Sequence, residues 1–452
     1  MFWVLPILYF LFLLFLTIKG ITKEKTDSAY FFDSHKTNWF YSLISLIATE
    51  TSVATILIFP SLGFQKNFNI FFLCLGYIVG RFIVAFYYLK HYHKLSSLSL
   101  YEHISEENSH NYLSFAYLVA KYISGSIRFF LAAFGMYQLT EVSIIFWLIL
   151  IALFVALYSG TGGLKSVILT DQLQGWIVFL SAVFFILYLN ENYSFSLSLE
   201  KDLSQNIEIK NSLILFFGSL LITISTHGGD QDLLQRIFSI QNYKKARLSL
   251  FLSGFVASII ILLFFYIGYT LFFIEKLNPK SPLLDFINRL PETNLYSDFT
   301  KSLFFVVLLA ASMSTLDSSI HSTGAIWKAI LRKKISIKNY YYSLFSLVLM
   351  LFFAFLFIEM EKYKDFFSLA FGFMNFINGA LFSFITLYVI FKKKLQKNLV
   401  IIILFWNILA VVICESLNLF WASTTIISFF SSLMLGLLIY LKKSFNKFEP
   451  YQ

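Results

Sequence analysis

Two acidic side chains, Glu50 and Asp317, fall inside long hydrophobic segments, where an ionised group is costly and usually serves binding or transport. Glu50 lies in the stretch 47–55, in which alanine, serine and threonine interrupt an otherwise apolar run, and Pro60 follows. Such a stretch can unwind where it lines a cavity, and the freed backbone carbonyls can then bind a cation. The alternative is a regular helix whose hydroxyl groups bond to its preceding turn.

A second polar pattern surrounds Asp317. Within residues 309–319, four small or hydroxylated residues share one helical face, because their spacing is i, i+3, i+4, i+7. They are Ala311, Ser314, Thr315 and Ser318. A stripe of hydroxyls suits a hard cation with oxygen ligands, and the lack of clustered histidine and cysteine argues against zinc or copper. The alternative is a small-residue face that lets two membrane helices approach closely, and the spacing alone leaves both open.

Arg128 lies deep in the hydrophobic segment 113–136, too far from either end for its guanidinium to reach bulk water easily. A guanidinium at such depth normally has a carboxylate partner, which here is either Glu50 or the carboxylate of a substrate. Arg81 and Lys121 lie nearer the ends of their segments. We interpret them as anchors whose long side chains extend to the membrane surface.

Residues 158–174 form a glycine-rich connection that leads into a helix. The connection lacks the P-loop pattern, so phosphate binding is rejected. Asp171, near the start of that helix, is either a partner for the helix dipole or a cation ligand, and the residues alone favour the dipole role. We interpret His227 and His321 as hydrogen-bonded structural residues.

The elements that position these residues are hydrophobic helices. The 452-residue chain is 58% hydrophobic and only 13% charged, which excludes an ordinary soluble domain. Its net charge of +10 comes from short basic clusters between apolar runs, so nucleic-acid binding is not indicated. About thirteen segments are long enough to cross the hydrocarbon core of a membrane. They lie near 3–18, 39–60, 68–89, 113–136, 143–159, 166–189, 212–227, 248–274, 301–326, 341–358, 366–391, 398–414 and 419–441.

Lysine and arginine are concentrated in alternate connections, as expected if these connections are cytoplasmic. Placing the N-terminus outside puts most of them inside, in clusters at 244–247, 332–334, 392–394 and 442–447. We therefore expect a single multi-pass membrane domain over residues 1–452 in the cell (inner) membrane, with the C-terminus in the cytoplasm.

Three motifs, in order along the chain, resemble the solute:sodium symporter family, which includes sugar, proline, sialic acid and monocarboxylate carriers. The first is residues 158–174, compared with Y-x-x-x-G-G-[LI]-x-A-V-x-x-T-D-x-x-Q. The second is residues 230–236, with the basic stretch 243–247 after it, and the third is residues 310–319. Together with the thirteen segments, the resemblance covers nearly the whole chain.

The resemblance implies an all-α fold of the LeuT type, in which two inverted repeats of five helices surround a site at the middle of the bilayer. The repeats would span about 37–189 and 211–391, with one further helix before them and two after them. It also implies a sodium site between the broken first repeat helix and the eighth core helix. The matching positions are Ala48, Thr51, Ala311, Ser314 and Thr315.

Some members of the family hold a second sodium ion just beyond the first. That site maps to Asp171, Ser314, Asp317 and Ser318. Asp317 stands where those members carry a hydroxyl group. The carboxylate therefore either strengthens the ion site or replaces it with a protonatable group.

Substrate in the family contacts the unwound segment, which makes Glu50, Ser52 and Thr55 the first candidates for substrate binding. Glu50 stands where the proline carriers have an essential aspartate. In the sialic acid branch, an arginine at the position of Arg128 pairs with the substrate carboxylate. The resemblance thus implies a solute that bears a carboxylate.

The expected function is sodium-coupled symport of a small organic solute of the sialic acid, amino acid or monocarboxylate type, by alternating access. One alternative is a proton-coupled carrier of the same fold, with the proton bound by Glu50 or Asp317, and another is a sodium/sugar symporter. A membrane sensor without transport is a third, and no catalytic constellation indicates an enzyme. The expected partners are the solute, sodium and the lipid bilayer, without nucleic acid or a required protein partner.

Overall fold

The computed structural model describes residues 2–21, 26–93, 98–193, 207–274, 276–291, 295–331, 337–360 and 366–445. Within these ranges the chain is helical, and β pairing is limited to two isolated bridges, Lys36 with Ile240 and Ser105 with Leu395. The predicted all-α class is therefore confirmed. The basic cluster at 332–334 and residue 447 lie outside the described residues.

In the described ranges, thirteen apolar helical segments correspond to the thirteen segments predicted from the sequence. Nine helices in the described ranges are long and apolar enough to cross a membrane. One further crossing is a bent pair, α3 (Trp39–Glu50) and α4 (Val53–Phe64), whose axes differ by 67°. Three shorter apolar segments, Val4–Gly20, Ile144–Ser159 and Asn375–Phe391, complete the set.

The other helices follow the same chain order as the predicted segments, with short helices in some connections. Their bounds are α1 (Val4–Gly20), α2 (Asp27–Phe32), α5 (Ile70–Ile83), α6 (Leu100–Ile104), α7 (His110–Thr140), α8 (Ile144–Asn192), α10 (Ile209–Gly229), α11 (Gln231–Phe238), α12 (Tyr243–Leu271), α13 (Pro282–Asn288), α14 (Leu295–Leu331), α15 (Asn339–Met360), α16 (Phe366–Phe391), α17 (Lys397–Ser416) and α18 (Trp421–Phe445).

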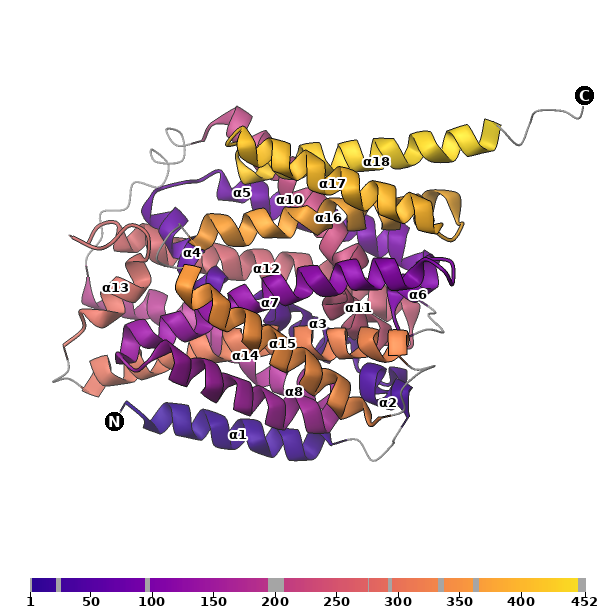
Figure 1. Ribbon diagram of the computed structural model, residues 1–452. Coiled ribbons are helices and arrows are strands. Elements are labelled where there is room, and N and C mark those ends of the chain that lie inside the picture. The colour runs from indigo at the N-terminus through magenta and orange to yellow at the C-terminus, as the bar shows by residue number, and fades with distance from the viewer. Residues whose placement is uncertain are drawn as a thin grey trace, which may run out of the picture.

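The long helices run in roughly the same direction, with α1 along one side of the bundle and α17 and α18 along the opposite side (Figure 1). The helices α2, α6 and α11 gather at one end, where α18 also ends (Figure 1). The bridges of Ile240 and Leu395 place the basic clusters 244–247 and 392–394 beside these short helices. Both clusters thus lie at one end of the bundle.

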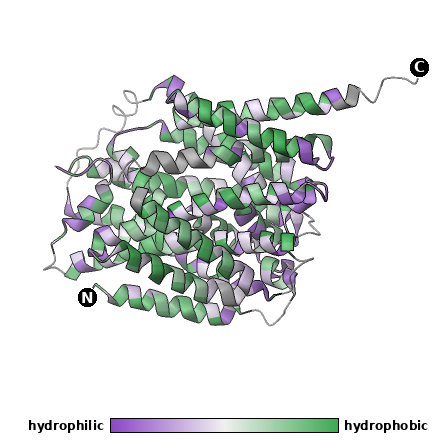
Figure 2. Ribbon diagram, in the orientation of Figure 1, coloured by the Kyte–Doolittle hydropathy of each residue, from purple (hydrophilic) through white to green (hydrophobic). Residues whose placement is uncertain are grey.

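Hydrophobic residues cover the middle of the bundle, and hydrophilic residues gather at its two ends (Figure 2). Large apolar side chains on the outer helices are exposed, among them Ile18, Phe405 and Leu438 at 71%, 69% and 59%. Exposing such a surface to water is unfavourable, whereas the acyl chains of lipids solvate it. The distribution fits a protein that crosses a bilayer.

At the centre of the bundle lies α14, in which every residue from Phe304 to Ile326 is buried. This helix contacts α7, α8 and α15, and also both halves of the bent pair. Its polar stripe therefore cannot face lipid. The hydroxyl groups must instead be satisfied inside the protein or by a ligand.

Residues 158–174 join two membrane crossings within α8, and the helix is interrupted at Gly163. Gly163 has φ +66° and ψ −166°, a conformation that is essentially restricted to glycine. A Cβ atom there would lie 2.7 Å from the carbonyl oxygen of Tyr30. The glycine motif thus serves a close packing contact with α2, and it positions the helical segment that carries Asp171.

Candidate functional site

The helix that contains Glu50 is broken, as the sequence predicts, so the alternative of a regular helix is wrong. Helix α3 ends at Glu50, Thr51 and Ser52 have extended backbone angles, and α4 begins at Val53. The Thr51 hydroxyl donates back to the carbonyl of Ile47 at 2.8 Å, and the backbone N–H of Ser52 lies 3.3 Å from the Thr55 hydroxyl. These contacts cap both half-helices, which stabilises the break.

Helix α14 meets the broken helix through its polar stripe. The Ser314 hydroxyl donates to the carbonyl oxygen of Ala48 at 2.9 Å, and the hydroxyls of Thr49 and Ser318 lie 3.1 Å apart. The Thr315 hydroxyl lies 3.2 Å from the carbonyl oxygen of Ala311, one turn earlier. The structure thus brings Ala48, Ala311, Ser314 and Thr315 together. Thr51 is near the same junction, but its own hydrogen bonds go back to Ile47.

Asp171 lies in the interior of α8, where it is fully buried. Its Oδ2 atom accepts hydrogen bonds from the Ser45 hydroxyl at 2.5 Å and from the Arg236 guanidinium at 2.9 Å. The interpretation of Asp171 as a simple partner for the helix dipole is therefore wrong. The residue binds a cationic side chain inside the protein.

Arg236 is a buried member of this cluster, and its role was not predicted from the sequence. Its guanidinium donates to Asp171, to the Ser318 hydroxyl at 2.5 Å, to the Ser45 hydroxyl at 2.7 Å and to the backbone carbonyl of Asp232 at 2.7 Å. It thereby connects α8, α14, α3 and its own helix, α11. The signal was present, since Arg236 ends the second of the three motifs.

Three buried oxygen atoms beside this cluster accept no hydrogen bond from the described part of the chain. They are Oδ1 of Asp171, Oδ2 of Asp317 and Oε1 of Gln174. Asp317 also accepts a hydrogen bond from the neighbouring Ser318 hydroxyl at 3.1 Å. Two carboxylates and one guanidinium are buried together here, and the oxygen atoms without a hydrogen-bond donor fit either a proton or a further cation.

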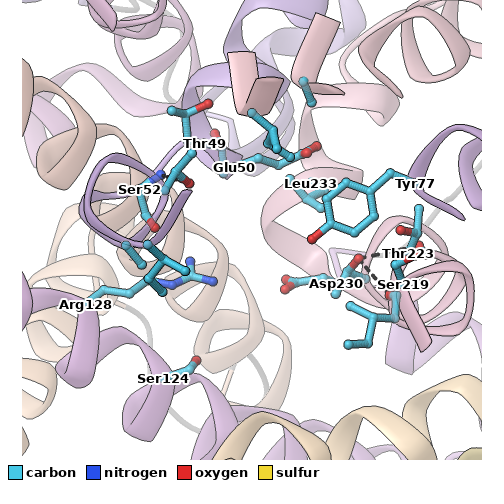
Figure 3. Close-up of a pocket in the computed structure, with 18 of the residues that line it drawn as sticks. Thr49, Glu50, Ser52, Tyr77, Ser124, Arg128, Ser219, Thr223, Asp230 and Leu233 are labelled. Carbon is cyan, nitrogen blue, oxygen red and sulfur yellow. Dashed lines mark hydrogen bonds between the residues drawn. The ribbon is translucent and has the colours of Figure 1, made fainter. Parts of the chain in front are cut away.

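A cavity of about 350 Å³ opens beside the helix break. Its wall is formed by α3 and α4 together with parts of α5, α7, α10, α11, α12, α16 and α18 (Figure 3). All four predicted substrate residues line it. They are Glu50, Ser52, Thr55 and Arg128.

The partners of Glu50 correct the predicted role of Arg81. The Arg81 side chain is buried, its guanidinium donates to Oε2 of Glu50, and its Nε atom lies 3.0 Å from Nε2 of His227. Oε1 of Glu50 lies 2.6 Å from the same nitrogen of His227. Arg81 is therefore no surface anchor, because α5 turns it toward the interior. His227 is hydrogen-bonded, as predicted, and lines the cavity as well.

Lys121 is also buried, so its interpretation as an anchor at the membrane surface is wrong. Its ammonium group lies 2.7 Å from Oδ2 of Asp230 and 2.6 Å from Oδ2 of Asp232. Asp230 has extended backbone angles between α10 and α11, and it caps α11 by accepting the N–H of Asp232 at 3.0 Å. A second helix break thus stands opposite the first. Its sequence signal was Gly228 and Gly229 followed by an N-cap aspartate.

We expect Lys121→Ala to destabilise the protein by about 3–5 kcal/mol, because two buried carboxylates would lose their cation. The measurement is the melting temperature of the purified protein in detergent, followed by size-exclusion chromatography. Lys338→Ala removes an exposed lysine and is the control. Equal melting temperatures for the two variants would contradict the assigned ion pairs.

Arg128 has a different environment from the other two cations of the cavity. It is half-buried and points into the cavity from α7 (Figure 3). No ion pair or hydrogen bond joins its guanidinium to any described residue. Of the two predicted partners, Glu50 is therefore wrong, because Arg81 and His227 bind its carboxylate. The guanidinium is free for a ligand.

The sequence profile of the Sodium:solute symporter family matches residues 30–398. The chain belongs to the sodium:solute symporter family. This family and the relatives described next are transporters rather than enzymes. The match covers both broken helices, the three motifs and the cavity residues other than Trp421.

Two bacterial members of the symporter family are similar to this chain. The sodium/sialic acid symporter NanT of Aliivibrio fischeri is 21% identical over 356 residues, which are 70% of this chain and 66% of the relative. The sodium/sialic acid symporter SiaT of Proteus mirabilis is 20% identical over 341 residues, which are 70% of this chain and 67% of the relative. The matches thus span about two thirds of each relative.

Solved structures of other symporters share the fold. A Na⁺-coupled sialic acid symporter in a substrate-bound, outward-open state superimposes with a TM-score of 0.79 at 18% identity, covering 97% of both chains. MhsT in complex with L-phenylalanine superimposes with a TM-score of 0.53 at 12% identity, covering 89% of this chain and 98% of MhsT. The LeuT-type fold predicted for this symporter family member is therefore confirmed.

Proposed function

We propose that the protein is a sodium-coupled symporter of a small solute that bears a carboxylate. The observation that carries this proposal is the unpaired guanidinium of Arg128 in the cavity beside the broken helix. A guanidinium binds a carboxylate through two parallel hydrogen bonds. At this depth in the membrane, water stabilises an unpaired guanidinium less well than a carboxylate does. The hydroxyls of Ser52 and Thr55 line the same cavity and are the proposed polar contacts for the rest of the solute. The relatives named for sialic acid support this class, because sialic acid is a carboxylic acid.

The proposed main sodium site lies between the helix break and α14. Its ligands are the carbonyl oxygens of Ala48, Thr51 and Ala311 and the hydroxyl oxygens of Ser314 and Thr315. The hydrogen bond from Ser314 to Ala48 supports this assignment, because it places two of the five oxygens in contact across the helix junction. Oxygen ligands of this kind suit a hard cation.

A second sodium ion is proposed at Asp171, Asp317, Ser314 and Ser318. The carboxylate oxygens of Asp171 and Asp317 that accept no hydrogen bond support it. Arg236 already neutralises one of the two charges, so a single additional cation balances the cluster. The ratio of ²²Na⁺ to solute taken up by proteoliposomes decides between one and two ions.

Sodium at the main site would join α3 to α14 and favour the state that binds the solute. Such a shift requires that sodium bind the two states of the carrier with different affinities. We propose that the two inverted repeats, 37–189 and 211–391, move relative to each other in this step. The helix breaks at Thr51 and at Asp230 support the repeats, because each interrupts the first helix of its repeat. The proposed location is the cell (inner) membrane, with the N-terminus outside and the C-terminus in the cytoplasm.

A thermal-shift screen tests the proposed solute class. Purified protein is heated with N-acetylneuraminate, proline, lactate or glucose, each with sodium chloride or with potassium chloride. A ligand that binds the folded state at 100 times its dissociation constant stabilises it by about 2.7 kcal/mol. We expect a carboxylate to raise the melting temperature only in sodium. Stabilisation by glucose alone would instead support a sodium/sugar symporter.

A further inference from the structure

Three cationic side chains of the described chain reach the wall of the cavity, and two of them have acidic partners. Arg81 binds Glu50, and Lys121 binds Asp230 and Asp232. Arg128 has no such partner, although Glu50 lies on the wall of the same cavity. The acidic side chains are thus distributed so that one guanidinium stays unpaired.

Both carboxylate oxygens of Glu50 have a partner in the structure. One carboxylate oxygen accepts from Arg81, and the other lies 2.6 Å from Nε2 of His227. Arg81 reaches this position because Gly254 lets α12 approach closely, since a Cβ atom there would lie 3.1 Å from Cδ of Arg81. The side chain of Glu50 therefore has its position set from α5, α10 and α12.

Because of its position in the broken helix, Glu50 needs Arg81 and His227 to hold its side chain in place. Glu50 is the last residue of α3, where the negative end of the helix dipole disfavours a carboxylate. Without Arg81, the carboxylate would turn to another cation, and the unpaired guanidinium of Arg128 faces the same cavity (Figure 3). An internal pair between Glu50 and Arg128 would then exclude an anionic ligand from the cavity.

We propose that Arg81, together with His227, is a positioning residue that holds Glu50 away from Arg128 and so keeps the guanidinium of Arg128 available to the solute. The proposal rests on the proposed function in that Arg128 binds the solute carboxylate. It assigns Glu50 an indirect role in solute binding. Arg81 thereby sets the charge selectivity of the cavity through Glu50.

Chemical modification of Arg128 tests this proposal without a transported solute. Phenylglyoxal condenses with unpaired guanidinium groups, and the modified peptide is quantified by mass spectrometry of the full-length protein in detergent. We expect Arg128 to react in the original protein and to react at least about fivefold more slowly in Arg81→Gln, the factor that corresponds to a weak ion pair. The double variant Glu50→Gln/Arg81→Gln should regain the original rate, because no carboxylate is left to bind Arg128.

Two results would overturn the proposal. One is an unchanged rate in Arg81→Gln, and the other is a double variant that stays slow, which would indicate a structural effect of losing Arg81. If Arg81→Gln does not fold, Glu50→Gln alone is decisive. It should leave the Arg128 reaction rate unchanged, because the carboxylate of Glu50 does not bind Arg128 while Arg81 holds it, whereas a faster reaction would show that Glu50 already pairs with Arg128 in the original protein. If an Arg128→Ala variant still binds the solute, the proposed function is wrong. The reaction rates of Arg128 with phenylglyoxal would still test whether Arg81 holds Glu50 away from Arg128.

Discussion

Replacing Ser314 and Thr315 with alanine is expected to abolish sodium-driven uptake while the protein still folds. The change removes two hydroxyl ligands of the proposed sodium site and the hydrogen bond from Ser314 to Ala48. A hydrogen-bonding contact to a charged group contributes about 1.5–3 kcal/mol, so we expect sodium affinity to fall by at least about 100-fold. Equilibrium binding of ²²Na⁺ to the purified protein measures this without knowledge of the solute.

Ser312→Ala is the matched control for this variant. Ser312 lies on the same buried helix, but its hydroxyl donates to Leu309 of its own helix rather than to α3. The control should bind ²²Na⁺ as the original protein does. If the variant with both Ser314 and Thr315 replaced also binds sodium normally, the proposed site between α3 and α14 is wrong.

Replacing Arg128 with alanine is expected to abolish binding of the carboxylate solute. Loss of one partner of a buried charge pair costs about 2–5 kcal/mol, which corresponds to an increase in the dissociation constant of roughly 30-fold to several thousand-fold. Arg128→Lys keeps the charge but loses the paired hydrogen bonds, so its affinity should be intermediate. Isothermal titration calorimetry with the carboxylate found in the thermal-shift screen measures the dissociation constants of the original protein, Arg128→Ala and Arg128→Lys.

Ser124→Ala is the control, because Ser124 lines the cavity one turn before Arg128. It should bind the solute almost as well as the original protein. Sodium binding without solute should be unchanged in Arg128→Ala, since the proposed ion site lies on other helices. A carboxylate that binds equally well to Arg128→Ala would show that the guanidinium serves another purpose.

The features that the sequence predicted correctly are those determined by local pattern. The thirteen apolar runs predict helices because a helix is the structure that satisfies its backbone within lipid, and each run corresponds to an apolar helical segment in the described part of the chain. The break at Thr51 and Ser52 was predictable because a carboxylate and several hydroxyls stand together in an apolar run. The polar face of α14 followed from the spacing of Ala311, Ser314 and Thr315.

The features that the sequence did not predict depend on which helices lie side by side. Arg81 and Lys121 look like surface anchors when only their distance from a segment end is considered. Their ion pairs require that Arg81 of α5 reaches Glu50 at the end of α3 and that Lys121 of α7 reaches Asp230 at the start of α11, and spacing along one helix does not determine such contacts. Arg236 was missed for the same reason, because its partner Asp171 is 65 residues away.

Uptake into proteoliposomes under separately imposed gradients is the most direct test of sodium-coupled carboxylate symport. Radiolabelled N-acetylneuraminate, proline, lactate and glucose are each supplied with an inward sodium gradient, with an inward proton gradient in sodium-free buffer, or with neither. We expect one of the carboxylates to accumulate above its external concentration only under the sodium gradient. Accumulation that follows the proton gradient without sodium would contradict sodium coupling, and accumulation of glucose alone would contradict the role of Arg128.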